Sequence, residues 1–65
     1  MKLHNVPKGS KIKVIEDIMT PPMALEIQIN EELKFLHIDG MYSLCINNKG
    51  EYVHLGACTE VEIIQ

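Results

Sequence analysis

Short stretches in which apolar and polar residues alternate run through most of this 65-residue chain. The segment "KIKVIE" at 11–16 places Ile12 and Val14 on one face and lysines on the other. The segment "ALEIQIN" at 24–30 repeats this pattern, and its predicted inward residues are Leu25, Ile27 and Ile29. A period of two is typical of strands with one buried face, whereas helices repeat every 3.6 residues. We therefore expect an all-β chain with no helix of normal length.

Further strands are predicted for "KFLHID" at 34–39, "MYSLCIN" at 41–47, "EYVHL" at 51–55 and "EVEII" at 60–64. Two prolines in "IMTPP" cannot donate to a sheet, so residues 17–23 are predicted as a loop or an edge. Gly40 permits a bend, and "NNKG" at 47–50 is a strong hairpin signal. The pattern favours an SH3-like small barrel of five to six short antiparallel strands. An OB-like barrel is the alternative.

The small size of the chain limits what it can build. It is predicted to form a single β-barrel domain, residues 1–65, and domains this small bury little surface and are marginally stable. The chain is 46% hydrophobic and lacks Trp, so the core must be mainly aliphatic. The surplus of apolar residues would suit a subunit interface, and we expect a homo-oligomer. With two cysteines, no leader-like segment and no apolar run of membrane length, the protein is expected to be soluble and cytoplasmic, with reduced thiols.

The charge of the chain argues against sequence-specific nucleic-acid binding. The net charge is −3, and all six basic residues are lysines. Arginine is the preferred residue for bidentate phosphate and guanine contacts, so its absence is informative. Four lysines nevertheless fall within the first 13 residues, and they are Lys2, Lys8, Lys11 and Lys13. They form either a solvated face or a local basic patch.

The "NNKG" turn predicts which side chains share a face of its hairpin. A two-residue tip at Asn48 and Lys49 would place Leu44 opposite Val53. The inner face would then hold Tyr42, Leu44, Val53 and Leu55. The outer face would be a polar and aromatic strip of Ser43, Cys45, Tyr52 and His54. This strip is either an ordinary solvated face or a surface for a ligand or partner.

Neither a metal site nor a catalytic site has the expected spacing. Cys45, His54 and Cys58 are metal-ligand types, but structural zinc sites normally have ligands two to four residues apart. Small buried thiols are the commonest alternative to a metal site, so the burial of Cys45 and Cys58 stays open, and no metal or cofactor is expected. His37, Asp39 and Ser43 are the residue types of a catalytic triad, yet nothing places Ser43 over the other two. A 65-residue barrel also has little room for a closed pocket, so the protein is not expected to be an enzyme.

The block "HIDGMYSLC…GEYVHLGACTEVEI", about half of the chain, resembles small proteins encoded by tailed bacteriophages. The shared features are the "DGMYS" bend, the "G-x-x-x-H-L" return strand and the closing "T-E-V-E". The chain departs from that pattern at Cys58, where many such sequences have a bulky aromatic residue. The resemblance implies a non-enzymatic accessory protein that binds and blocks a host factor. Some proteins of this kind sequester nucleotide second messengers at subunit interfaces.

These observations combine into one expected function: a non-catalytic binding protein that sequesters or inhibits a host component in the host cytoplasm. A nucleotide-like ligand is slightly preferred over a host protein. The predicted ligand contacts are Tyr42, Ser43, His54 and Thr59, with charge supplied by Lys11 or Lys13. The alternatives are an inhibitor that binds a host protein directly, or a nucleic-acid-associated small barrel that uses the N-terminal lysines.

Overall fold

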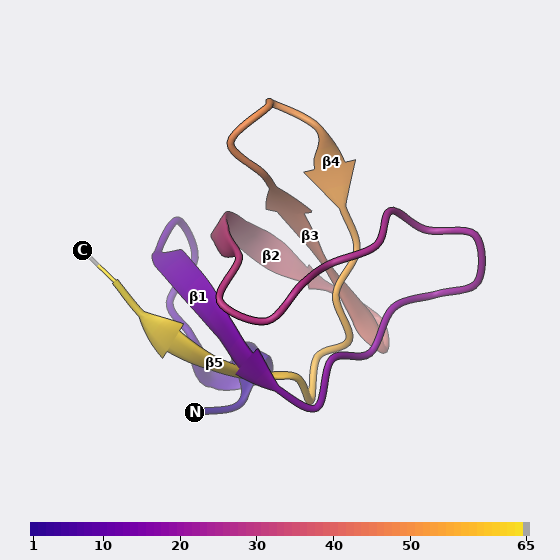
Figure 1. The fold of residues 1–65 in the computed structure, drawn as a ribbon. Helices are drawn as coiled ribbons and strands as arrows, with labels where there is room; N and C mark the ends of the chain where they lie inside the picture. The colour runs from indigo at the N-terminus through magenta and orange to yellow at the C-terminus, as the bar shows by residue number, and fades with distance from the viewer. Residues whose placement is uncertain (65) are drawn as a thin grey trace.

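The computed structural model describes residues 1–64, which fold around one antiparallel sheet (Figure 1). The strands are β1 (Lys11–Glu16), β2 (Glu32–Asp39), β3 (Tyr42–Ile46), β4 (Tyr52–Val53) and β5 (Glu60–Ile63). A single 3₁₀ turn, η1 (Leu3–Asn5), precedes them. The prediction of an all-β chain of five antiparallel strands is confirmed.

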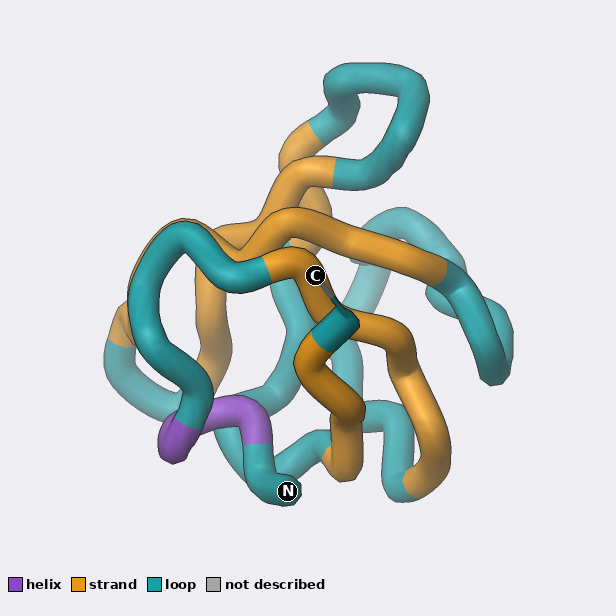
Figure 2. The backbone as a smooth tube through the Cα atoms, turned by 90° about the vertical axis from the view of Figure 1, so that its left-hand side faces the viewer, coloured by secondary structure: helices purple, strands orange, loops and turns teal. Residues whose placement is uncertain are grey.

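The order of strands in the sheet is β4-β3-β2-β1-β5, so the last strand pairs with the first. Strands β2, β3 and β4 follow one another as an antiparallel meander, and a long connection joins β1 to β2. This is the connectivity of a small barrel-like fold. Figure 2 shows that the strands wrap around one another rather than lying in a flat layer, and that η1 lies beside the N-terminal end of the trace.

The core is aliphatic apart from one aromatic ring, as the composition predicts. Phe35 is 1% exposed and lies among residues from every strand and from the N-terminal segment. The alternation in β1 holds, because Ile12 and Val14 are fully buried. In β5, Val61 is fully buried and Ile63 packs against the core from its edge.

Residues 24–30 do not form the predicted strand and belong to the long connection between β1 and β2. Only Ile27 of its three apolar residues is buried, whereas Leu25 and Ile29 are 46% and 52% exposed. The connection contains positive φ angles at Asp17, Met23 and Asn30, which interrupt an extended backbone. Strands β1 and β2 each have a strand on both sides, and the segment reaches the sheet only at its end, where the Asn30 N–H donates to the Val14 carbonyl oxygen at 2.7 Å.

The β3–β4 hairpin forms where predicted but with a register shifted by one residue. Cys45 pairs with Val53 and Ile46 with Tyr52. The reason is a three-residue loop, residues 48–50, instead of a two-residue tip: the Asn47 N–H donates to the Glu51 carbonyl oxygen at 3.0 Å, and Gly50 has a φ of 80°. Hairpin loops of three residues commonly end in a left-handed residue.

This shift exchanges the two faces of β3. Ser43 and Cys45 point inward with Val53, and both are fully buried. The residues that alternate with them point outward and are half-buried, namely Tyr42, Leu44 and Ile46. The predictions that Tyr42 and Leu44 belong to the core and that Ser43 and Cys45 lie outside are therefore wrong.

Candidate functional site

Two predicted ligand contacts, Ser43 and Thr59, are fully buried. The Ser43 hydroxyl donates to the Leu55 carbonyl oxygen at 2.8 Å. The Thr59 hydroxyl accepts a hydrogen bond from the backbone N–H of Met19 at 3.3 Å. Both hydroxyls therefore join segments of the fold, and neither lies at the surface where the prediction placed it.

Tyr42 and His54, the other two predicted polar contacts, do lie on one side of the sheet. Tyr42 is half-buried on the outer face of β3, and His54 is exposed just after β4. The Nδ1 atom of His54 lies 3.2 Å from the Ser43 carbonyl oxygen. Because a carbonyl only accepts, this hydrogen bond places a proton on Nδ1 and leaves Nε2 facing away from it. The bond fixes the orientation of the ring.

The predicted lysines lie on β1, two strands away from β3. Lys11 Nζ is 3.8 Å from a carboxylate oxygen of Glu32, and Lys13 Nζ is 4.0 Å from one of Glu62. Lys2, at the start of the chain, pairs with Glu60 at 3.2 Å. Neighbouring glutamates thus offset three lysines of the expected basic patch, and the six predicted contacts do not form one compact site.

The register aligns a further lysine, Lys34, with the predicted contact Lys11. Lys11 pairs with Lys34, Lys34 with Ile46, and Ile46 with Tyr52, across four neighbouring strands. We call these four residues the outer-face row. Sequence reasoning missed Lys34, although its position directly before the buried Phe35 indicates an outward side chain.

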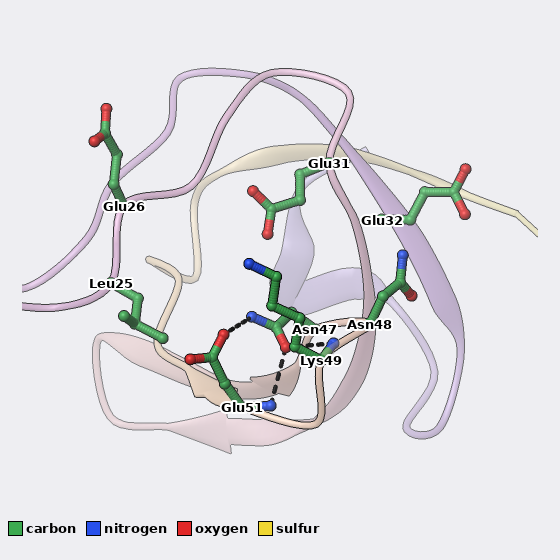
Figure 3. A pocket seen from close by; sticks show the side chains of 8 residues that line it. All are labelled: Leu25, Glu26, Glu31, Glu32, Asn47, Asn48, Lys49 and Glu51. Carbon is green, nitrogen blue, oxygen red and sulfur yellow. Dashed lines mark hydrogen bonds between the residues drawn. The ribbon is translucent and has the colours of Figure 1, made fainter.

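A cavity of about 490 Å³ lies between the long connection and the β3–β4 hairpin (Figure 3). Its lining consists of Leu25, Glu26, Glu31, Glu32, Asn47, Asn48, Lys49 and Glu51. Four carboxylates against one ammonium give this lining a formal charge of −3. In Figure 3, Lys49 extends from the hairpin toward Glu31, whereas Glu26 and Glu32 point outward on opposite sides.

Hydrogen bonds hold both walls of this cavity. On the hairpin side, the Asn47 side-chain oxygen accepts from the backbone N–H groups of Lys49 and Glu51, each at 2.9 Å. The Asn47 amide donates to the Glu51 carboxylate at 2.9 Å. On the loop side, a carboxylate oxygen of Glu31 accepts from the Gln28 N–H at 3.1 Å. The polar groups at the rim are therefore positioned before any ligand arrives.

The long connection also exposes apolar side chains beside the cavity. Its exposed apolar residues are Met19, Met23, Leu25 and Ile29, with exposed fractions from 46% to 104%. In Figure 1 this connection projects away from the sheet. We call residues 17–31 the apolar loop. Sequence reasoning missed this surface, because the alternation of "ALEIQIN" predicted that Leu25 and Ile29 point inward.

The two thiols differ in their surroundings. Burial raises the pKa of the Cys45 thiol, which keeps it protonated and unreactive. Cys58, in contrast, is exposed. Among residues 1–64, no group of three or more His, Cys, Asp or Glu side chains could hold a metal ion.

No helix in the described part of the chain is both long and apolar enough to cross a membrane. Comparisons of the chain with family models, curated proteins and solved structures found no match. The surfaces described above are therefore the basis for any functional assignment.

Proposed function

We propose that the protein is a non-enzymatic binding protein that blocks a host protein by docking it on the apolar loop and the adjoining acidic cavity. The phage setting comes from the sequence resemblance, and the docking surface comes from the geometry. The observation that carries the proposal is the exposure of four large apolar side chains on one loop beside four carboxylates.

The apolar loop argues for a macromolecular partner. Soluble proteins seldom gather large apolar side chains at one exposed place unless that place binds something. Met23 is fully exposed, and Leu25 belongs both to the loop and to the cavity wall. Methionine adapts its shape readily, which suits it to a contact surface. A partner that covered this loop would bury the apolar area that the fold leaves in water.

The charge of the cavity specifies the partner further. A lining with a formal charge of −3 attracts lysine or arginine side chains and repels phosphate groups. This favours the host-protein alternative over a nucleotide-like ligand at this position. The expected partner segment carries basic residues next to apolar ones. Self-association, expected from the composition, stays a prediction.

The test is a selection from a library of random displayed peptides, with binding confirmed by calorimetry. We expect the enriched peptides to combine lysine or arginine with apolar residues. The double substitution Met23→Ser and Leu25→Ser should weaken their binding about tenfold, because two buried contacts of a few tenths to one kcal/mol each are lost. Glu26→Gln should weaken binding less, and more at low salt than at high salt.

Met41→Ser is the matched control, since Met41 is 76% exposed but lies at the β2–β3 turn outside the loop. It should leave peptide affinity unchanged. Enrichment of acidic peptides, or equal losses in the Met41 and loop variants, would contradict the proposal.

A further inference from the structure

The outer-face row places two lysines directly opposite each other. Lys11 and Lys34 are cross-strand partners, and both are exposed. Like charges at opposed positions repel each other, which destabilises the strand pair. Lys11 has Glu32 at 3.8 Å, whereas no carboxylate of the described residues lies within ion-pair distance of Lys34. This arrangement leaves a positive charge unpaired on a chain whose net charge is −3.

The same row ends in an aromatic ring. Tyr52 is 62% exposed and pairs with Ile46, which in turn pairs with Lys34. Two strand spacings separate Lys34 from Tyr52, or roughly 10 Å. The four strands lie side by side in Figure 1, in the order of the sheet. A cation and an aromatic face therefore flank one apolar side chain.

The next positions on this face continue the pattern. His37 on β2 pairs with Leu44 on β3. His54 comes two residues after Tyr52, so the two side chains share one face. Both histidines are exposed. Aromatic rings on an open sheet face stack bases, and lysines beside them bind phosphate. One carboxylate of the acidic cavity lies beside this row, because Glu32 lines the cavity and lies 3.8 Å from Lys11 Nζ, so the unpaired ammonium of the row is that of Lys34.

We propose that the outer-face row is a nucleotide site, in which Lys34 and Lys11 bind a phosphate and Tyr52 stacks on the base. The site adjoins the docking surface of the proposed function at Glu32, which lines the cavity and lies 3.8 Å from Lys11 Nζ. It uses one of the lysines predicted from the sequence, together with Lys34 and Tyr52 in place of the buried Ser43 and Thr59. The shared chemistry is a base with its phosphate, whether free or within a single strand.

The experiment titrates ¹⁵N-labelled protein with adenosine 5′-monophosphate and follows amide signals by NMR. We expect the largest shifts at Lys34, Ile46 and Tyr52, and weaker binding of adenosine, which lacks the phosphate. Lys34→Gln and Tyr52→Ala should each weaken binding about fivefold or more. Lys34→Arg should retain binding of adenosine 5′-monophosphate, since the positive charge is kept. These side chains are exposed, so the variants should stay folded, which the NMR spectrum itself reports.

Lys8→Gln is the matched control, because Lys8 is an exposed lysine in the turn before β1. An equal loss in Lys8→Gln and Lys34→Gln, or shifts confined to other surfaces, would overturn the assignment. A second titration, with hexa-deoxyadenylate, distinguishes binding of a free nucleotide from binding of a single strand. Tighter binding with a steep salt dependence indicates a strand, and equal binding per nucleotide indicates a free nucleotide. Failure here would leave the peptide selection of the proposed function unaffected.

Discussion

Glu60 ties the start of the chain to the last strand. One carboxylate oxygen lies 2.8 Å from the N-terminal ammonium of Met1, and the other lies 3.2 Å from Lys2 Nζ. A backbone hydrogen bond joins the same two segments, because the Val61 N–H donates to the Met1 carbonyl oxygen at 2.9 Å. The hydrogen bond from the N-terminal ammonium, followed by that from Lys2, lowers the pKa of Glu60.

A lowered pKa in the folded state makes the contribution of Glu60 dependent on pH. The stabilisation is present above the unfolded pKa of a glutamate, about 4.3, and is lost as pH falls through the lower folded value. We therefore expect Glu60→Gln to be less stable than the wild type at pH 7. The difference should shrink steadily below about pH 4. Urea unfolding of both proteins at pH 7, 5 and 3 measures this difference in stability.

Glu62→Gln is the control for this residue, since Glu62 has only a 4.0 Å contact to Lys13 and is exposed. The stability of Glu62→Gln should differ less from that of the wild type at every pH. A gap between wild type and Glu60→Gln that stayed constant from pH 7 to pH 3 would rule out the role given to the carboxylate.

At the scale of the elements, the turn before β5 holds the start of the apolar loop against the barrel. The Gly56 N–H donates to the Met19 carbonyl oxygen, and the Met19 N–H donates to Thr59 Oγ1. Gly56 is buried, and a Cβ placed on it would lie 2.6 Å from the Met19 Cβ. The absence of a side chain at Gly56 is what permits this close approach.

Gly56→Ala should therefore destabilise the protein by about 1–3 kcal/mol, because overpacking forces backbone or side-chain shifts. The measurement is urea unfolding at neutral pH. Met19→Gly removes the facing Cβ, so the double variant should lose less than the sum of the two single losses. Strictly additive losses would show that the steric contact has no role.

The elements themselves could largely be predicted from the sequence, because β1, β2, β3 and β5 each alternate strongly and have turn residues between them. The register of the β3–β4 hairpin depends on the length of its loop, and the residues "NNKG" do not determine that length. A two-residue tip and a three-residue loop fit the same residues, yet they place Ser43 on opposite faces. The register buried Ser43 and left Tyr42 and His54 together on the outer face, whereas Thr59 is buried in the turn before β5, where its hydroxyl accepts from the Met19 N–H.

The apolar loop could not be predicted for a different reason. The segment at 24–30 has a perfect strand alternation, but a strand also needs a free neighbour in the sheet. That condition belongs to the whole fold, in which β1 and β2 already have partners on both sides. Lys34 was missed although its position directly before the buried Phe35 indicates an outward side chain.

At the scale of the whole molecule, the two surfaces differ in charge and chemistry. The apolar loop and its cavity combine exposed methionines and aliphatic side chains with carboxylates. The outer-face row combines lysines with a tyrosine. The two surfaces meet at Glu32, which lines the cavity and lies 3.8 Å from Lys11 Nζ.

The central claim is that a basic, apolar segment docks on the apolar loop, and methionine methyl NMR tests it most directly. All four methionines are exposed, and Met19 and Met23 lie in the loop whereas Met1 and Met41 do not. On adding a peptide from the selection, we predict that the Met19 and Met23 methyl signals shift and that the Met1 and Met41 signals stay in place. Shifts at Met1 or Met41 with an unchanged Met23 signal would contradict the account.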